Sequence, residues 1–285
     1  MAKARKKPDR QKRSFPVRYY FYIVTTITLL LIVFIKLSPP QSSPASETVL
    51  GAAAPPGASY SRKVVNSSAG RFTIDVISAD LGNIRVLVDT ASDGDCSTDC
   101  PVLPLKIYID RNNAFAGING SYFCPASYPS CAGKTNAFDT LLMNRNKVYF
   151  NSDNNVYSTV PAAIFGDGWA RFVSQSLEWG RDTGVDGVIA NQPLLVLGNN
   201  VAFGGDEDPK KGSRGPRGFV GNTGSTLYIG IVRNATVAQA AIALQAMGIE
   251  NALNLDSGGS TALWYGGYKA GPGRSIPNAI VLVAK

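Results

Sequence analysis

One carboxyl, two glycines and two hydroxyls lie close together near the C-terminus, in the stretch NALNLDSGGSTALWY: Asp256, Gly258, Gly259, Ser260 and Thr261. A carboxylate can act as a base or as a nucleophile. Glycines allow positive φ and a close approach to the backbone, and the amides of such a turn can hold an anion. Taken alone, the stretch is equally typical of a tight hairpin whose Asp caps its own turn.

The chain contains no histidine. This excludes histidine-dependent triads, histidine zinc sites and histidine proton shuttles, so any acid or base must be Asp, Glu, Lys, Tyr or Cys. No P-loop and no dinucleotide-binding glycine fingerprint is present, and no organic cofactor is predicted. The loop acids Asp206, Glu207 and Asp208 have the oxygen ligands that a hard divalent cation takes, but such a cluster is more often simply solvated.

The elements that position these residues are mostly strands. Residues 71–79 and 83–91 alternate and are predicted to be paired strands, and residues 251–255 form a buried strand that ends at Asp256. Ligand sites favour such strand ends. Further strands are predicted at 114–120, 147–151, 162–166, 170–174, 187–198, 217–222, 226–232, 261–265 and 278–284.

Two helices are predicted, a short one at 103–111 and a clear one at 236–247. In the second, Thr236 and Gln239 form a capping box, and Gly248 suits the position after the last turn. Many strands with few helices predict an α+β fold, a single domain with a large mixed β-sheet.

Positive charge is concentrated at the N-terminus. The chain has a formal charge of +8, and residues 1–36 hold nine of its basic residues and one acid, so the remainder is balanced at nineteen of each. A neutral remainder predicts no nucleic-acid-binding face.

Residues 19–35 carry no charge, which is enough for a helix of about 25 Å that just crosses a bilayer. We predict a basic cytoplasmic tail at 1–18, a transmembrane anchor at 19–37, a disordered Pro/Ser/Ala-rich linker at 38–61 and a domain at 62–285. The basic tail places the N-terminus in the cytoplasm and the domain outside it. The alternative is a cleaved signal peptide.

Four cysteines, Cys96, Cys100, Cys124 and Cys131, follow the predicted anchor. An even number on the far side of a membrane predicts two disulfides, with local pairing favoured among three connectivities. The spacing is poor for the alternative, a four-cysteine zinc site.

Five segments occur in an order that resembles the phosphodiester glycosidase family: GINGSYF, IANQPLLVLG, RGPRGFVG, LNLDSGGST and RSIPNAIVLV. The resemblance covers residues 62–285. It departs from the family at Ser121 and Ser257, where glycine is usual, and at Gly218, where threonine is common.

The resemblance implies hydrolysis of a glycosyl phosphodiester. Cleavage at the anomeric carbon expels a phosphate monoester, whose second pKa near ~6 lets it leave with little protonation. The missing histidine is then no obstacle. Such a site needs cationic and amide donors around the phosphate, and a carboxylate near the developing sugar cation.

By the same resemblance, the catalytic candidates are Asp256, Arg217 and Asn119. Asp256 would act as base or nucleophile, or would orient Arg217. Arg217 would hold two phosphate oxygens in a fork. Asn119 would donate to phosphate or sugar, although an Asn that caps its own turn is an alternative.

The predicted substrate-binding residues are Gly120, Asn254, Gly258, Gly259, Ser260, Thr261, Arg214, Arg274, Asn278 and Asp139. Buried structural hydrogen bonds would explain Asn254 and Asn278 equally well. The aromatic residues Tyr122, Phe123, Trp264 and Tyr265 could stack on a sugar, but strand aromatics are more often core.

Together these features predict a membrane-anchored extracytoplasmic hydrolase that cleaves glycosyl phosphodiesters in an envelope polymer or an exported glycoconjugate. Its partners would be a glycan or sugar-phosphate substrate and, through the N-terminal helix, the membrane. The alternatives are a non-catalytic glycan-binding or envelope-assembly module of the same fold, and an enzyme of this fold that cleaves another bond, such as one in peptidoglycan or an exopolysaccharide.

Overall fold

A computed structural model describes residues 51–153 and 159–285. These residues belong to one compact unit, Leu50–Lys285. The predicted tail, the predicted anchor and most of the predicted linker lie outside the described residues. Within the two described ranges, no helix combines the length and the apolar character needed to cross a bilayer.

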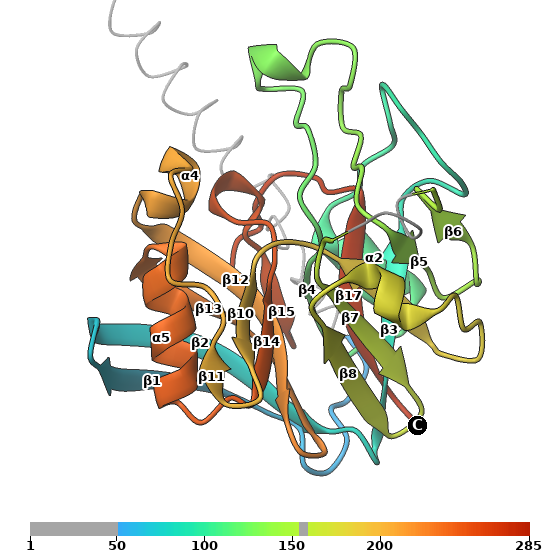
Figure 1. The fold of residues 1–285 in the computed structure, drawn as a ribbon. Helices are drawn as coiled ribbons and strands as arrows, with labels where there is room; N and C mark the ends of the chain where they lie inside the picture. Colours follow the sequence, from blue (N-terminus) through green and yellow to red (C-terminus); the bar gives the residue numbers. More distant parts are fainter. Residues whose placement is uncertain (1–50, 154–158) are drawn as a thin grey trace, which may run out of the picture. The chain divides into compact units, whose positions relative to one another are not determined.

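The domain is built from three antiparallel sheets (Figure 1). The order of the seven-stranded sheet is β1 (Ser59–Ser67), β2 (Gly70–Asp80), β13 (Thr226–Ala235), β12 (Gly215–Thr223), β14 (Asn251–Asn254), β10 (Leu194–Leu197) and β11 (Asn200–Val201). One five-stranded sheet has the order β16 (Tyr268–Ala270), β15 (Leu263–Tyr265), β4 (Ala116–Asn119), β17 (Asn278–Ala284) and β3 (Ile84–Thr90). The other has the order β6 (Tyr149–Phe150), β5 (Leu142–Met143), β9 (Gly187–Ala190), β7 (Ala162–Gly166) and β8 (Trp169–Val173).

The described helices are few and short. The α-helices are α2 (Leu105–Arg111), α4 (Pro209–Gly212) and α5 (Val237–Ala246), and the 3-10 turns are η1 (Pro129–Cys131), η2 (Ser176–Trp179) and η3 (Gly258–Ser260). The prediction of a single, mostly β, α+β domain with few helices is confirmed. The prediction of one large mixed sheet is wrong, because every strand pairing among the described residues is antiparallel and the strands form three sheets.

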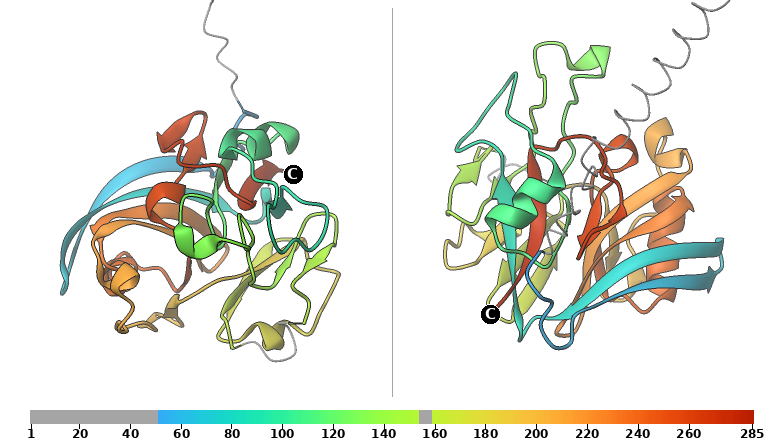
Figure 2. Two further views of the ribbon diagram at one scale, coloured as in Figure 1. Left: turned by 90° about the horizontal axis from the view of Figure 1, so that it is seen from above. Right: turned by 180° about the vertical axis from the view of Figure 1, so that it is seen from behind.

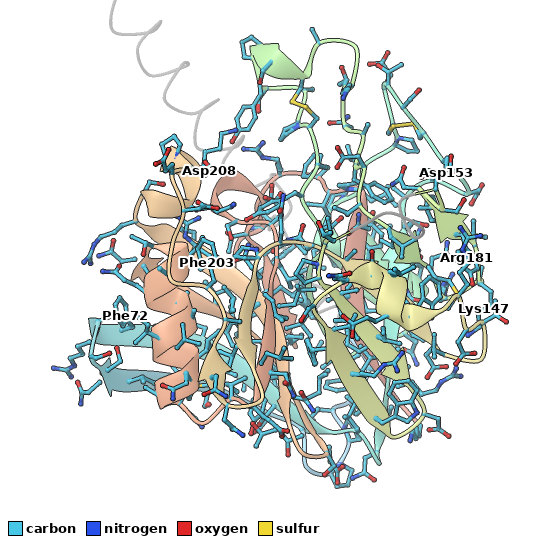
Figure 3. The ribbon with its side chains drawn as sticks, viewed as in Figure 1. Phe72, Lys147, Asp153, Arg181, Phe203 and Asp208 are labelled. Carbon is cyan, nitrogen blue, oxygen red and sulfur yellow. A yellow bond between two sulfur atoms is a disulfide. The ribbon has the colours of Figure 1, made fainter. Side chains whose placement is uncertain are left out.

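A central hydrophobic core lies between the sheets and takes residues from all three, including Ile229, Ile280 and Phe165. Helix α5 covers the other face of the seven-stranded sheet, where Phe72 and Phe203 lie near it (Figure 3). Helix α2 packs against β4, β15 and β17. Fully burying each large aliphatic or aromatic side chain stabilises the fold by about 1.5–3 kcal/mol.

Helix α5 begins at the capping box that the sequence predicts. The Thr236 hydroxyl accepts from the Gln239 amide at 3.1 Å, and the Gln239 side chain accepts from the Thr236 amide at 3.0 Å. Gly248, at φ +87°, follows the helix. This helix leads directly into β14, which delivers Asp256 to the end of the seven-stranded sheet.

Two predictions about the N-terminal half need correction. Strands β2 and β3 do not pair with each other: β2 pairs with β1 and β13, while β3 pairs with β17. Alternation shows that a segment is a strand but not which strand is its partner. The chain is also structured before residue 62, since β1 begins at Ser59 and the Ala58 carbonyl accepts from the Tyr265 hydroxyl at 3.1 Å.

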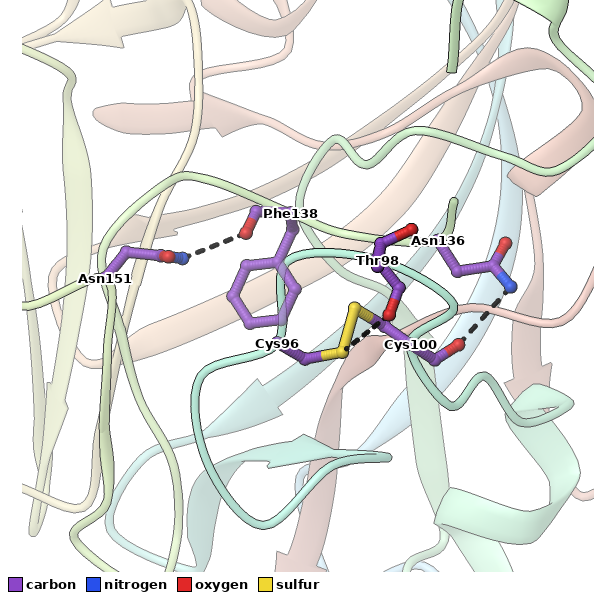
Figure 4. The surroundings of a disulfide bond; sticks show 6 residues. All are labelled: Cys96, Thr98, Cys100, Asn136, Phe138 and Asn151. Atoms are coloured by element: carbon purple, nitrogen blue, oxygen red, sulfur yellow. Dashed lines mark hydrogen bonds between the residues drawn. A yellow bond between two sulfur atoms is a disulfide. The ribbon is translucent and has the colours of Figure 1, made fainter. Parts of the chain in front are cut away.

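The four cysteines form the two local disulfides predicted from the sequence, Cys96 to Cys100 and Cys124 to Cys131. Around the first, the Asn136 side chain donates to the Cys100 carbonyl and the Phe138 ring lies alongside (Figure 4). One cysteine of each bridge, Cys96 and Cys124, lines a pocket next to the candidate site described below.

Candidate active site

The Asp256 loop is held in place by backbone hydrogen bonds at the end of β14. The Asp256 amide donates to the Gly120 carbonyl at 2.9 Å, and the Ser257 amide donates to the Asp256 carboxylate at 2.8 Å. The Ser257 hydroxyl donates to the Leu255 carbonyl at 3.1 Å and accepts from the Gly218 amide at 3.3 Å. The serine that departs from the family pattern therefore ties the loop to β12.

Asn119, at the end of β4, holds this loop through hydrogen bonds from its side chain to the loop backbone. Its side-chain nitrogen donates to the Asp256 carbonyl at 2.7 Å, and its side-chain oxygen accepts from the Ala262 amide at 3.0 Å. The residue is fully buried. Both polar atoms thus serve the backbone of residues 256–262, so the structure gives Asn119 a positioning role.

Asn278 has a similar role beside Gly120. Its side-chain oxygen accepts from the Ser121 amide at 2.8 Å, and its nitrogen donates to the Ser121 hydroxyl at 3.0 Å. A Cβ at Gly120 would lie only 1.9 Å from that oxygen, so this position needs glycine. Asn278 is 1% exposed and bonds the second serine that departs from the family pattern.

Asn254 connects the loop to Tyr122. Its side-chain nitrogen donates to the Tyr122 hydroxyl at 2.6 Å and to the Gln192 carbonyl at 3.0 Å. Because that carbonyl can only accept, the amide orientation is fixed, and the Asn254 oxygen is left buried with no partner among the described residues. Asn191 completes the group, since its side chain accepts from the Tyr122 amide and donates to the Asn254 carbonyl.

The electrostatic surroundings of Asp256 suit a reactive carboxyl. Burial raises the pKa of Asp256 to about 6, and this rise is opposed by the Ser260 hydroxyl, the Ser257 amide and the cations Arg274 and Lys210. At neutral pH the carboxyl is therefore mostly ionised and basic enough to accept a proton.

Tyr122 keeps its proton at neutral pH. Burial, together with the negative charge of Asp256, raises the pKa of Tyr122 to about 12. Because Asn254 donates to the phenol oxygen, the phenol hydrogen is available for another acceptor. Tyr122 is thus a neutral hydrogen-bond donor next to an ionised carboxylate.

Arg217 lies in β12, and its positive charge lowers the pKa of the nearby Tyr122. Most of the nitrogens of its guanidinium already donate hydrogen bonds to main-chain carbonyls. Its Nε donates to the Ala235 carbonyl at 3.0 Å, and one terminal nitrogen donates to the Lys210 and Ser213 carbonyls. The residue is 7% exposed. Among the described residues only Nη1 has no partner, so the two-oxygen phosphate fork is not free as the side chain lies here, and it stays a prediction.

Two other cations face the Asp256 loop. The Arg274 guanidinium lies against Gly259, where a Cβ would be 2.2 Å from it, and its amide donates to the Gly259 carbonyl at 2.9 Å. Arg274 and Lys210 also flank the ring of Tyr128, at 5.2 and 5.4 Å from its centroid. Tyr128 is 41% exposed and is held by the loop that the Cys124 disulfide closes.

The glycine turn itself is partly occupied. The Thr261 amide donates to the Gly258 carbonyl at 3.1 Å within the 3-10 turn, and Gly258 has φ +65°. The Thr261 hydroxyl is buried with no hydrogen-bond partner in the described part of the chain. Gly258 and Gly259 are exposed, so the open face of the turn is available to a ligand.

Tyr122 also lines a pocket of about 670 Å³ whose wall includes both disulfides. Such a volume is within the roughly 300–1,000 Å³ of small-molecule sites. The other lining residues include Phe123, Phe138, Asp139 and Lys134. Asp139, predicted as a substrate-binding residue, thus reaches this pocket, whereas Trp264 and Tyr265 pack in the core.

The remaining predicted residues lie elsewhere. Arg214 lines a separate, arginine-rich pocket. In the acidic loop, Asp208 caps α4 by accepting from the Lys210 amide at 2.8 Å (Figure 3), and Asp206 pairs with Lys211. In the residues that the structure describes, no group of three or more Cys, Asp or Glu side chains is arranged to hold a metal ion.

Sequence reasoning missed Lys210 and Tyr128 and gave Tyr122 only a stacking or core role. Lys210 lies in a charged loop that looks solvated, and Tyr128 lies in a loop without alternation. The available signal was the second cysteine pair, because a disulfide that closes a seven-residue separation near a strand end indicates a loop that is held in position.

Comparisons with known proteins found a matching family model and similar solved structures. The family model described as phosphodiester glycosidase matches residues 112–283. The zebrafish N-acetylglucosamine-1-phosphodiester alpha-N-acetylglucosaminidase catalytic domain, solved auto-inhibited by its pro-peptide, has a TM-score of 0.62 and 16% identity over 82% of this chain and 86% of that chain. A hypothetical protein from Synechocystis has a TM-score of 0.61 and 14% identity over 81% of this chain.

The chain spans 64% of the length of the Synechocystis protein. At 14% and 16% sequence identity, the likeness of these two structures to this chain shows a shared fold and nothing more. A search of curated proteins found no match.

Proposed function

Because the chain belongs to the phosphodiester glycosidase family, we propose that it hydrolyses a glycosyl phosphodiester and that Asp256 is its reactive carboxyl. The observation that carries this proposal is the setting of Asp256. A half-buried carboxyl with a pKa raised to about 6 lies at an open glycine turn, within the field of Arg274 and Lys210.

The proposed reaction breaks the bond between the anomeric carbon and the phosphate oxygen. The bonding electrons leave with that oxygen, and a water oxygen replaces it on the sugar. Asp256 either takes the proton of that water or attacks the anomeric carbon first, and both roles need the ionised carboxylate. Arg274 and Lys210 would neutralise the phosphate before and after cleavage.

Tyr122 would donate its hydrogen to a substrate oxygen. The support is its raised pKa of about 12 and the hydrogen bond that Asn254 gives its oxygen. The unpartnered Asn254 oxygen and Thr261 hydroxyl would accept from, or share hydrogens with, sugar hydroxyls. The pocket beside Tyr122 would hold the sugar, since aromatic side chains favour sugar faces.

We also propose that the domain acts outside the cytoplasm, anchored by residues 19–37, on an envelope polymer or an exported glycoconjugate. Two disulfides in a domain of this size are typical of an oxidising compartment. The uncharged run of residues 19–35 after a basic tail supports the anchor and its orientation.

The direct test is release of free sugar from an N-acetylglucosamine-1-phosphodiester, the bond named in the zebrafish relative, with a panel of other sugar-1-phosphodiesters beside it. Asp256→Asn should lower kcat by about a hundredfold or more, because general acid–base groups contribute roughly that much. Asp167→Asn is the matched control, since Asp167 is 81% exposed in the β7–β8 turn.

A wild-type protein that binds these diesters tightly and releases no sugar would instead support the glycan-binding module. Equal rates for wild type and Asp256→Asn would remove Asp256 from the reaction.

A further inference from the structure

A second pocket, of about 340 Å³, lies apart from the Asp256 carboxyl and is lined by four arginines and two neutral polar residues: Arg62, Arg71, Arg214, Arg233, Thr73 and Asn234. Strand register explains most of this convergence. Arg62 is opposite Asp75, and Asp75 is opposite Ile231, so alternation places Arg62, Arg71, Thr73 and Arg233 on one face of the sheet.

Two of the arginines are fixed by one buried carboxylate. The Asp75 side chain is fully buried; one of its oxygens accepts from Arg62 Nε and the Tyr60 hydroxyl, both at 2.7 Å, and the other accepts from Arg233. These bonds lower the pKa of Asp75, against the effect of its burial. Because Arg62 is held through Nε, its two terminal nitrogens remain without a partner among the described residues.

The other two arginines are unpaired. Arg71 and Arg214 are exposed, and neither forms an ion pair or side-chain hydrogen bond with any residue of 51–153 or 159–285. Four arginines against one carboxylate leave three positive charges around one recess. Because the chain after residue 36 is balanced in charge, this is a local concentration of charge within a neutral domain.

The recess is connected to the active site by two short segments. Arg214 stands three residues before Arg217 at the start of β12, and Gly218 contacts the Asp256 loop. Arg233 donates to the Lys269 carbonyl in β16, and the chain after β16 turns back onto Ser260 and Thr261 at Gly273. In the view from behind, β1 and β2 extend from the body beside β12 and β13 (Figure 2).

We infer that this arginine pocket is a second anion site that binds a phosphate of the substrate next to the one being cleaved. The substrate class is then a polymer or oligomer of sugars joined by repeating phosphodiesters, rather than an isolated diester. The identification of the ligand rests on the proposed function, whereas the anion site itself does not.

The chemistry of the pocket favours a phosphate group on a glycan. Guanidinium forks match phosphate oxygens, and the Thr73 hydroxyl and Asn234 amide add neutral donors that suit sugar hydroxyls. The pocket volume is at the small end of the roughly 300–1,000 Å³ of ligand sites, which fits a single sugar phosphate unit. None of its lining residues is aromatic, so it offers no platform for nucleobases.

The test compares synthetic sugar-1-phosphodiesters that contain one, two or four diester linkages, using the full chain. Arg71→Ala removes an unpaired cation that makes no contact with the Asp256 loop. Lys63→Ala is the matched control, because Lys63 carries the same charge on the same hairpin but pairs with Ile74 on the opposite face. Arg71→Lys separates charge from the guanidinium fork.

We expect wild type to have a higher kcat/KM on the four-linkage substrate than on the single diester. Arg71→Ala should reduce that advantage by about tenfold, the effect of losing one charged hydrogen bond at a solvent-exposed site. Its kcat/KM on the single diester should remain unchanged, and Lys63→Ala should behave as wild type on both. Tripolyphosphate binding, measured by calorimetry, should weaken in Arg71→Ala in parallel.

The inference is overturned if Arg71→Ala and Lys63→Ala bind tripolyphosphate equally well, or if single-stranded DNA binds the pocket more tightly than the four-linkage substrate. If wild type cleaves the single diester and shows no gain with length, the polymer assignment fails while the proposed function stands. If no diester is cleaved but Arg71 still controls anion binding, the proposed function fails and the anion site stands.

Discussion

Replacing Asp256 by Asn should stabilise the protein at neutral and alkaline pH, at the expense of activity. The folded state raises the pKa of this carboxyl from 3.8 to about 6, mainly by burial. The folded state therefore binds the proton more tightly than the unfolded chain, and ionisation of Asp256 costs stability as the pH rises through this window. Asn keeps the shape and the oxygen that accepts from the Ser257 amide at 2.8 Å.

The magnitude follows from the size of the pKa change. At about 1.4 kcal/mol per tenfold change in ionisation constant, the rise corresponds to about 3 kcal/mol. Because Asp256 keeps part of its surface in contact with solvent, screening reduces this to about 1–2 kcal/mol.

Urea denaturation of wild type and Asp256→Asn between pH 4 and pH 8 measures the difference directly. The two should be about equally stable near pH 4, and the variant should gain its full advantage by about pH 7. A variant that is no more stable than wild type at pH 8, or whose advantage does not change with pH, would refute the electrostatic reasoning.

Three further outcomes are expected around the same loop. Tyr122→Phe removes only the phenol oxygen and should lower kcat on a cleavable diester by about tenfold, the effect of losing one hydrogen bond near 1.4 kcal/mol. Arg274→Ala removes a cation that lowers the pKa of Asp256, so the acidic limb of the pH profile of kcat should move to higher pH. Asn119→Ala leaves the Asp256 carbonyl and the Ala262 amide without their partner and should destabilise the fold by about 2–4 kcal/mol, measured by urea denaturation.

Most of the local features of this structure were predictable from the sequence. The Thr236 capping box, the strand before Asp256 and the two disulfide loops all depend on neighbouring residues, and each was predictable from them. The resemblance to the phosphodiester glycosidase family rested on five motifs in the family order, and the match of the family model to residues 112–283 confirms the family.

The hydrogen bonds of the predicted site residues depend on how loops fold back onto the strands, which the sequence pattern does not show. Arg217 looks like a free phosphate ligand until the carbonyls of Lys210, Ser213 and Ala235 are brought to it by α4 and the end of β13. Asn119 looks like a donor for substrate until the loop at residues 256–262 closes over it.

The arginine pocket was also not predictable from the sequence pattern. Arg62 and Arg233 are separated by most of the domain in sequence and meet only because β2 lies between β1 and β13 with a particular register. Asp75, the carboxylate that holds them, reads in the sequence as one acid in an otherwise ordinary strand.

The most direct test of the central claim is the fate of solvent oxygen when a sugar-1-phosphodiester is hydrolysed in heavy-oxygen water. If Asp256 directs attack at the anomeric carbon, mass spectrometry of the early products will find the label in the sugar and none in the phosphate monoester, and Asp256→Asn will release neither product at a comparable rate. Label in the phosphate would show attack at phosphorus and would contradict the account, whatever the rate.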